Sequence, residues 1–424
     1  VAEPGARIVD PNRWQPLALA QNVAQNGLPI PGNVQRFVGP QWGNVAAFAL
    51  PASAEGLPVD PGPPPRLGDD QASAEAFQQA AVDVILDSSY LDPGDGATID
   101  IGPGSVGDNP LGTNDGDGRD VNPSTGDPYA PNVVLRGDFA RALAEFWADG
   151  PESETPPGHW NTIANDVSDS RDLELRIGGD GAEVDRLEWD VKLYFALNGA
   201  VHDAAVAAWG VKGYYDSARP ISMIRYMGGY GQSTDPAGPA YHPDGLPLVP
   251  GLVEVITAAS SAPGQPHEHL ADHVGEVAVK AWQGNPEDPS QASGVGWIRA
   301  VDWVPYQRAT FVTPAFAGYV SGHSTFSRAA AEVMAAFTGD PYFPGGIAEW
   351  TVATGDLVTE AGPSGDVTLQ SATYFDAADQ AGISRIFGGI HIRADDFAGR
   401  RIGSSCGRDA WTLAQRYFDG TAPA

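Results

Sequence analysis

Beyond residue 135 the sequence consists largely of runs with the composition and apolar spacing of helices, and this pattern limits the possible folds more than any other feature. Apolar residues that recur every three to four positions form one face of a helix, and that face must pack against other elements. Alternation typical of strands is scarce. The sequence therefore predicts an all-α fold with a helical-bundle core. The predicted helical runs are residues 136–149, 183–210, 252–261, 268–282, 324–339, 372–389 and 409–418.

The first 135 residues differ in composition from the rest. Residues 1 to about 70 are rich in proline and glycine, which favour turns and extended backbone over helix. One helical run follows at Ala72–Leu86, and Asp92–Asn132 is a long loop rich in Gly, Asp and Asn. We expect residues 1–135 to form an extended, loop-rich arm with one helix, and residues 136–424 to form the core that carries the functional site.

The composition excludes several classes of partner. The formal net charge of −30 excludes nucleic acid and anionic membrane surfaces, because both require a basic surface. No apolar run approaches the ~20 residues that span a bilayer. Cys406 is the only cysteine, which excludes an intramolecular disulfide. The chain begins at Val1 rather than Met, so a removed signal peptide and a secreted or periplasmic location stay open. The sequence determines neither the location nor the oligomeric state.

Three basic residues lie in short motifs that suit a tetrahedral oxyanion. Lys212 precedes Arg219 by seven positions, Arg219 is followed by Pro220, and Arg385 follows Ser384. Oxyanions bind tightly when their charge is neutralised and each oxygen has a donor, and planar guanidinium groups donate to two oxygens at once. Lys212 adds a more mobile point charge. Pro220 is expected to end a helix or fix a turn just after Arg219.

The motif Ser321-Gly322-His323 adds donors of other kinds. Ser321 offers a hydroxyl, and the amide of Gly322 can approach an anion closely because no β-carbon intervenes. The predicted helical run 324–339 follows at once. An anion bound here would therefore lie at a helix N-terminus, where free amides and the helix dipole favour negative charge.

A second histidine stands near the C-terminal motif. His391 follows Arg385 after five residues, and Asp395 stands four positions after His391. If this segment is helical, Asp395 lies on the same face as His391 and can orient its imidazole. The chain thus supplies two imidazoles for chemistry on one oxyanion.

The order and spacing of these motifs resemble the superfamily of type 2 phosphatidate phosphatases, class A bacterial acid phosphatases and vanadium-dependent haloperoxidases. The pattern is a lysine, six residues and Arg-Pro, then Ser-Gly-His, then Ser-Arg, five residues, His, three residues and Asp, and every position matches. Val320 replaces the proline that usually precedes the serine. The long segment between Arg219 and Ser321 implies an insertion relative to compact phosphatases.

The flanking sequences resemble the haloperoxidases in particular. The run TPAFAGYVSGHSTF from Thr313 and the run SRIFGGIHIRADD from Ser384 are similar to stretches of the fungal vanadium chloroperoxidase. The segments Gly39–Pro51 and Phe146–Asn161 resemble bacterial members. The resemblance implies the helical-bundle arrangement of these enzymes, with vanadate as the cofactor and phosphate in the site when vanadate is absent.

The resemblance also implies a role for each motif residue. His391 binds vanadium through a ring nitrogen, and His323 acts as an acid–base near the opposite, apical oxygen. Lys212 also polarises the peroxide. The vanadate oxygens are held by Lys212, Arg219, Ser321, Gly322 and Arg385. The implied partners are hydrogen peroxide, a halide (chloride or bromide) and a small organic acceptor. Peroxide oxidises the halide to a hypohalous acid, which halogenates the acceptor.

Two aromatic residues fall on positions that line the halide pocket in the resembled enzyme. Trp209 stands three residues before Lys212, and Phe316 stands five residues before Ser321. They are expected to form a dry pocket in which a halide reacts without its full solvent shell. Ordinary core packing is the alternative, since buried aromatic residues are common.

Two other functions stay open at the level of sequence. An acid phosphatase could use the same residues, because vanadate and phosphate share shape and charge. His391 would then be the nucleophile and His323 the acid for the leaving group. A helical protein that keeps the anion site without catalysis is the third alternative, and Trp209, Phe316 and the flanks favour the haloperoxidase.

Three weaker patterns carry open alternatives. The acidic loop Asp92–Asn132 invites calcium but lacks the closing glutamate of an EF-hand loop, which favours a solvated loop. The cluster His267, His269 and His273 invites zinc but lacks the HExxH order, which favours a surface cluster or a role at an entrance. Asp203 is expected either to pair with a site arginine or to be capped or solvated.

Overall fold

The computed structural model describes residues 8–51, 57–151 and 153–422. Residues 1–7 and 52–56 of the predicted arm, Glu152 and the last two residues lie outside the described residues. No helix in the described part of the chain is long and apolar enough to cross a membrane.

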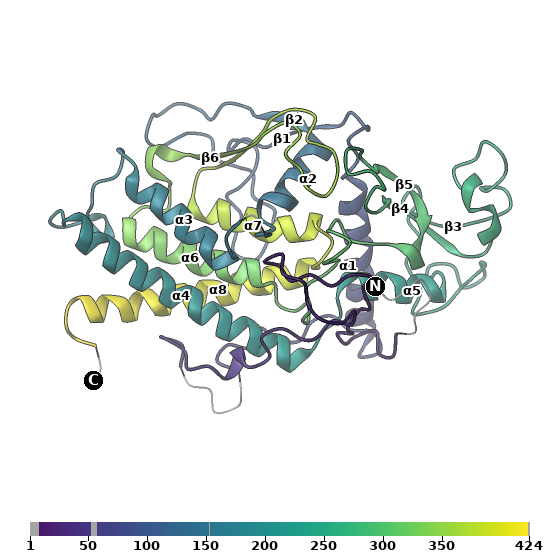
Figure 1. The fold of residues 1–424 in the computed structure, drawn as a ribbon, viewed down its shortest axis with the longest axis horizontal. Helices are drawn as coiled ribbons and strands as arrows, with labels where there is room; N and C mark the ends of the chain where they lie inside the picture. The colour runs from purple at the N-terminus through teal and green to yellow at the C-terminus, as the bar shows by residue number, and fades with distance from the viewer. Residues whose placement is uncertain (1–7, 52–56, 152, 423–424) are drawn as a thin grey trace.

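Four helices lie side by side in the centre of the molecule (Figure 1). They share one large core that is rich in small apolar side chains, among them Ala200, Ala204 and Ala330, all fully buried. These four helices position the functional residues described below. Their bounds are α4 (Arg186–Tyr215), α6 (Gly322–Thr338), α7 (Tyr374–Phe387) and α8 (Arg393–Phe418).

Helix α8 approaches α6 closely because glycine recurs along one of its faces. A β-carbon at Gly403 would lie 2.4 Å from the carbonyl oxygen of Thr325, and one at Gly407 would lie 2.5 Å from that of Ala329. Such distances are shorter than carbon and oxygen tolerate, so larger residues would push the helices apart. The close packing brings the beginning of α8 next to the beginning of α6.

The remaining helices surround this core. Helix α2 begins at the start of the predicted core, and α1 belongs to the predicted arm but contacts α5, α7 and β4. The boundary after residue 135 stays a prediction. The bounds of these helices are α1 (Gln71–Ser89), α2 (Arg136–Phe146), α3 (Pro156–Asp169) and α5 (Pro220–Tyr230).

The structure also contains short antiparallel sheets, so the all-α prediction is only partly right and the fold is mainly helical. The first sheet pairs β1 (Thr98–Asp100) with β2 (Val133–Leu135). The second has the order β3 (Val253–Val255), β4 (Val277–Trp282) and β5 (Val295–Arg299). The third pairs β6 (Ala348–Val352) with β7 (Val367–Ser371). Short 3₁₀ turns connect some of these elements.

Two predicted helical runs are wrong, and both lie in the long segment between Arg219 and Ser321. The run 252–261 contains β3, and the run 268–282 contains a 3₁₀ turn followed by β4. In β4 every residue except Lys280 is buried, so the strand shows no clean alternation. Its alanine-containing sequence therefore resembles a buried helix when it is taken without its partner strands.

Two helices were not predicted because both begin with proline. In α3 the side chain of Thr155 accepts the amide hydrogen bond of Gly158, and prolines occupy the first two positions. In α5 Pro220 is the first residue, so it starts a helix after Arg219 instead of ending one. Proline suits this position because its missing N–H would have no partner within the helix.

The N-terminal residues cross the front of the bundle near the end of α4 (Figure 1). The Trp14 amide donates to the Asp216 carbonyl at 2.8 Å, and Gln35 donates to the Thr313 carbonyl at 2.8 Å. The buried carboxylate of Asp203 in α4 accepts three amide hydrogen bonds from residues 48–50, at 2.5 to 3.0 Å. Asp203 is therefore capped by backbone and does not pair with a site arginine.

Candidate active site

Two cations stand at the junction of α4 and α5. Lys212 lies in the last turn of α4, which ends where Asp216 takes a left-handed conformation with φ 48°. Arg219 is the residue before α5, and Pro220 turns the chain into the new helix. The short junction therefore directs both side chains to the same place. Lys212 is 0% exposed and Arg219 is 1% exposed.

The second motif forms the beginning of α6. Ser321 is the N-cap, and its hydroxyl oxygen accepts the amide hydrogen bond of Ser324 at 3.3 Å. This leaves the hydroxyl hydrogen of Ser321 free for another acceptor. The amide of Ser321 donates to the carbonyl of Asp395 at 2.9 Å, which ties the start of α6 to the start of α8.

The third motif spans the junction of α7 and α8. Arg385 lies in the last turn of α7, His391 lies before α8, and Asp395 lies in its first turn. The guanidinium group of Arg385 donates to the Ser384 hydroxyl at 2.9 Å and to the carbonyl of Ala144 in α2. These bonds fix the orientation of Arg385, which is 2% exposed.

The structure brings the three motifs together. Arg219 Nη1 lies 3.0 Å from His391 Nε2 and donates to the carbonyl of Ile390 at 2.8 Å. Lys212 Nζ donates to the carbonyls of Ala317 and Gly318 at 2.8 and 3.0 Å. Arg219 Nη2 is buried and has no hydrogen-bond partner among the described residues. A buried donor of this kind is costly unless a ligand accepts from it.

His391 is held in one orientation by Asp395. Its Nδ1 lies 2.8 Å from Asp395 Oδ2 in a buried pair. With the proton on Nδ1, the unprotonated Nε2 is the atom through which imidazole binds a metal, and in this structure its lone pair accepts from Arg219 Nη1 at 3.0 Å. Burial, together with the charges of Arg219 and Lys212, lowers the pKa of His391 well below its usual value. Burial raises the pKa of Asp395 to about 7, although Lys212 and Arg219 oppose the rise.

Within the described residues, none of the three cations forms a direct ion pair with a carboxylate. Burial lowers the pKa of Arg219 to about 9 and that of Arg385 to about 10, while Asp395 and Asp149 respectively act in the opposite direction. Burial and the charge of Arg219 lower the pKa of Lys212 well below its usual value. A bound anion would compensate these buried charges, so the cluster is suited to receive one.

His323 faces two residues that the sequence patterns did not identify. Its Nε2 lies 3.3 Å from Asp149 Oδ2, and Asp149 Oδ1 lies 2.9 Å from His159 Nδ1. Burial lowers the pKa of His323, although Asp149 opposes this. Burial tends to raise the pKa of Asp149, but hydrogen bonds with His159 and His323 outweigh it and lower that pKa. Asp149 follows α2 and His323 lies at the start of α6, so the two are far apart in the sequence and no local motif predicts their contact.

A cavity of about 440 Å³ opens onto these groups. His323, Arg385 and His391 line it, and so do Trp209 and Phe316, whose ring centroids are 4.9 Å apart. The Trp209 indole donates to the Val38 carbonyl at 2.9 Å, so the arm helps to fix the aromatic wall. The predicted pocket residues therefore lie beside the predicted anion residues.

The cavity has room where an anion would need it. A β-carbon added at Gly322 would meet only the ring edges of Phe326 and Trp209, at 3.6 Å, which is ordinary contact. The protein itself therefore does not require glycine at this position. The free space, the unpartnered donor of Arg219 and the lone pair of His391 together fit a metal oxyanion such as vanadate.

The other candidate sites do not assemble. His269 Nε2 lies 2.7 Å from the Trp297 carbonyl, His273 pairs with Glu276, and His267 lies against Ser260. No group of three or more histidine, cysteine or acidic residues that could hold a metal ion occurs in the described ranges, which include the loop Asp92–Asn132.

Comparisons with known proteins agree with the fold. A family model described as the VCPO second helical-bundle domain matches residues 192–420. No curated protein matches the chain. The holo-type bacterial vanadium-dependent chloroperoxidase matches 98% of this chain with a TM-score of 0.56 at 18% identity, and the apo-type structure matches 98% with 0.58 at 18%. The chain covers 64% of the length of each.

Proposed function

The chain belongs to the family of the VCPO second helical-bundle domain, and on this basis we propose that it is a vanadium-dependent haloperoxidase. It would oxidise chloride or bromide with hydrogen peroxide to a hypohalous acid that halogenates organic acceptors. The observation that carries the proposal is the gathering of three buried cations around His391, which lines an aromatic-walled cavity together with Arg385. Bound vanadate would supply Lewis-acid activation of the peroxide.

The residues of the chain would bind the oxyanion and orient its protein ligand. Arg219, Arg385 and Lys212 neutralise the oxyanion, while the Ser321 hydroxyl and the Gly322 amide donate to its oxygens. His391 provides the protein ligand through Nε2, and Asp395 holds the proton on Nδ1 and keeps the ring in place.

His323 is the group that moves protons in this proposal. Its lowered pKa leaves the ring mostly neutral at neutral pH, so it can accept a proton from the incoming peroxide. Asp149, 3.3 Å away, then stabilises the charged ring. Trp209 and Phe316 exclude water from the space beside these groups, which favours reaction of a poorly solvated halide.

The purified protein tests this proposal directly. With orthovanadate, hydrogen peroxide and bromide or chloride it should halogenate a phenol-red-type dye, and phosphate should inhibit by occupying the same cations. Turnover of a phosphate monoester without any vanadate-dependent halogenation would instead establish the acid phosphatase. Running the assay with each halide also determines halide preference.

Three histidine variants separate the roles. His391→Ala should lose vanadate in equilibrium dialysis, whereas His323→Ala should retain binding and lose at least about 100-fold in turnover, the usual contribution of a positioned acid–base. His202→Ala is the matched control, because His202 lines the same cavity but lies against the Ala46 carbonyl, at 2.9 Å. Tight vanadate retention by His391→Ala would disprove the ligand assignment.

A further inference from the structure

A second cavity, of about 250 Å³, lies beside the first and has no role in the chemistry described above. Its walls are mainly apolar and carry three aromatic rings, those of Phe146, Tyr306 and Phe311. Flat apolar walls of this kind suit an aromatic molecule. We call this cavity the side chamber.

The side chamber adjoins the cavity that contains His323. The two cavities share four lining residues, which are Gln25, Ala148, Gln307 and Phe311. A molecule in the side chamber would therefore lie next to the cavity that His323 and His391 line. Helix α2 also connects them, since the Ala144 carbonyl holds Arg385 while Ala144 lines the side chamber.

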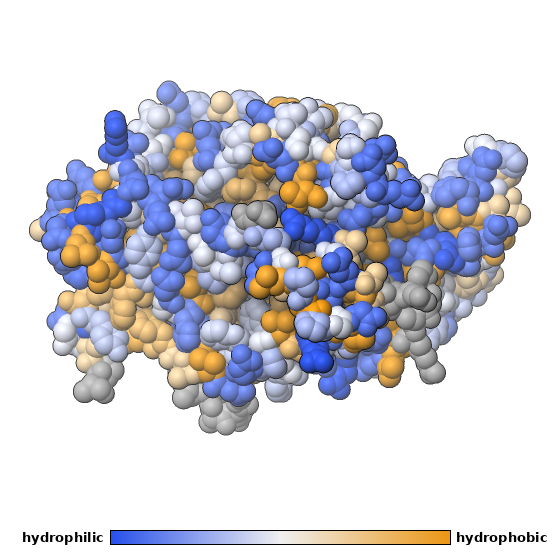
Figure 2. Space-filling model, viewed as in Figure 1, coloured by the Kyte–Doolittle hydropathy of each residue, from blue (hydrophilic) through white to orange (hydrophobic). Residues whose placement is uncertain are grey.

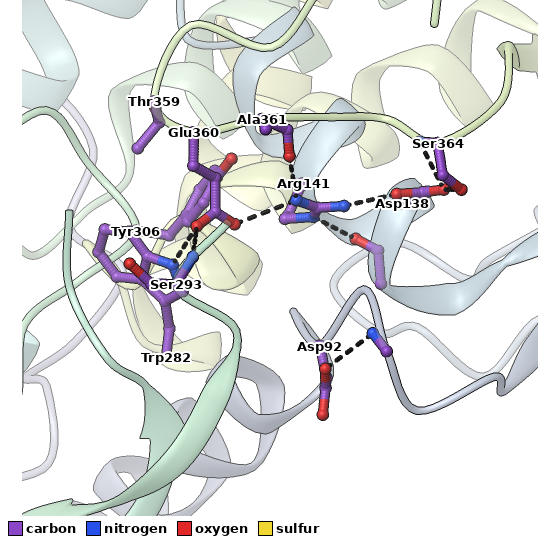
Figure 3. Close-up of polar contacts among 12 residues, drawn as sticks. Asp92, Asp138, Arg141, Trp282, Ser293, Tyr306, Thr359, Glu360, Ala361 and Ser364 are labelled. Carbon is purple, nitrogen blue, oxygen red and sulfur yellow. Dashed lines mark hydrogen bonds and ion pairs between the residues drawn. The ribbon is translucent and has the colours of Figure 1, made fainter. Parts of the chain in front are cut away.

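Buried polar contacts lie next to residues of one wall of the side chamber, and Figure 3 shows these contacts around Glu360 and Arg141. Glu360 accepts from Arg141 at 3.1 Å and from the Trp282 indole at 3.0 Å, and all three side chains are fully buried or nearly so. The neighbouring residues 357–359 line the chamber. A binding wall fixed in this way loses little conformational freedom when a ligand binds.

Of the two acidic groups among the described lining residues, one is engaged in hydrogen bonds and the other is exposed to solvent. Glu145 already accepts from the amides of Val358 and Thr359, at 2.7 and 3.0 Å, and from the Tyr306 hydroxyl at 2.9 Å. The other carboxylate in the lining, Asp356, is exposed.

Among the described residues that line the side chamber, Arg308 is the one cation. It is half-buried, and within the described residues its guanidinium group forms neither a hydrogen bond nor an ion pair. Its backbone is fixed, because its carbonyl accepts the amides of Phe311 and Val312 at 2.9 and 2.8 Å. A half-buried guanidinium group without a partner beside three aromatic rings matches a ligand that combines an aromatic ring with a negative charge.

We propose that the side chamber binds the organic acceptor and that this acceptor is an aromatic molecule with an anionic substituent, such as a carboxylate. The source of the oxidant rests on the proposed function. Hypohalous acid from the adjoining cavity would transfer its halogen to a ring carbon. A carbon–halogen bond forms as the carbon–hydrogen bond breaks, and the released proton joins hydroxide to give water.

Binding of 4-hydroxybenzoate by calorimetry tests the proposal without vanadate or peroxide. Sulfate at a saturating concentration fills the oxyanion site, so that the probe reports on the side chamber. The protein should bind 4-hydroxybenzoate in preference to tyramine, which carries the opposite charge. Arg308→Gln should weaken binding about tenfold, the value of one charge-assisted hydrogen bond, and Arg308→Glu should reverse the preference.

Arg171→Gln is the matched control, because Arg171 is exposed and lines neither cavity. Its affinity for 4-hydroxybenzoate should equal that of the unchanged protein. Displacement of the probe by sulfate, no saturable binding, or equal affinity in Arg308→Gln would each overturn the proposal. Binding of the probe to a protein that fails the vanadate-dependent assay would leave the side chamber established and the proposed oxidation disproved.

Discussion

At the scale of single residues, the motifs predicted which side chains meet but not what surrounds them. The spacing from His391 to Asp395 places the two on one helical face, and they lie 2.8 Å apart. Asp149 and His159 escaped prediction because their contact with His323 depends on the packing of α2 and α3 against α6, which no local pattern encodes. The lack of a partner for Arg219 Nη2 is likewise visible only in the folded chain.

Gly322 provides a residue-scale prediction. Gly322→Ala should leave the unfolding free energy within about 0.5 kcal/mol, because the added carbon meets only ordinary contacts and alanine suits the first turn of a helix. The same carbon occupies space at the predicted oxyanion position, so sulfate affinity measured by calorimetry should fall about tenfold, a loss of about 1.4 kcal/mol.

Gly213→Ala is the control for this prediction. A β-carbon at Gly213 in α4 would meet nothing within 4 Å, so this variant should keep its sulfate affinity. Unchanged sulfate affinity in Gly322→Ala would show that the anion does not approach the start of α6.

At the scale of elements, the sequence predicted long helices well and short or proline-led elements poorly. Helices α4, α6 and α7 fall on predicted runs, and α8 was predicted only from residue 409 onward, because long runs of helix-forming residues are recognisable without their partners. Strand β4 was mistaken for helix because its identity depends on pairing with β3 and β5, which lie elsewhere in the chain. The junctions between helices, where most of the site residues lie, carried the chemical motifs and so were the best predicted loops.

The contact between α7 and α8 contains a buried carboxylate whose hydrogen bonds and ion pair do not fully compensate the loss of solvent. Asp379 is 3% exposed, and burial raises its pKa to about 6 although Arg400 opposes the rise. Arg400 Nη1 lies 2.9 Å from Asp379 Oδ1, but Arg400 also donates to both oxygens of Asp396. Of the two carboxylates that share the Arg400 guanidinium group, Asp379 therefore has the weaker interaction with it.

This arrangement predicts a pH dependence of stability. Because the pKa of Asp379 is higher in the folded chain than in the unfolded chain, its favourable contribution is complete below about pH 4 and is lost as the pH rises through 6. Asp379→Asn should therefore match the unchanged protein near pH 4 and be more stable by about 1 to 3 kcal/mol at pH 8. Urea unfolding at several pH values measures this difference.

Asp396→Asn is the paired control. Asp396 accepts two bonds from Arg400, at 2.9 and 2.7 Å, and one from the Ser324 hydroxyl at 2.7 Å. Its replacement should cost about 3 kcal/mol or more, since it leaves a buried cation without its main partner. Equal stability of Asp379→Asn and the unchanged protein at pH 8 would show that Arg400 fully compensates Asp379.

At the scale of the whole molecule, polar and apolar side chains are divided unevenly over the surface. Figure 2 shows hydrophilic residues over most of one face, as the net charge of −30 leads one to expect. Apolar side chains gather at the lower left of that view, over the ends of α4 and α8. Near the start of α4, Leu187 and Val191 are 73% and 60% exposed. No pattern in the sequence predicted this patch.

The sulfur-containing side chains, unlike these apolar ones, are all buried. The chain has three methionines and one cysteine, Met223, Met227, Met334 and Cys406, and none is more than 2% exposed. Hypochlorite should therefore add no oxygen to these side chains in the native protein during a time that fully oxidises them in guanidinium, as followed by mass spectrometry. Leu187→Met places a thioether at a position that is 73% exposed, so this variant should gain oxygen while folded.

Under the proposed function, the burial of every sulfur atom determines how long the protein survives contact with its product. Thioether and thiol groups are the first targets of a hypohalous acid, and here the packed helices shield all four of them. Under the proposed function, the protein should therefore stay active while it releases an oxidant, whereas neighbouring proteins with sulfur at their surfaces are damaged first.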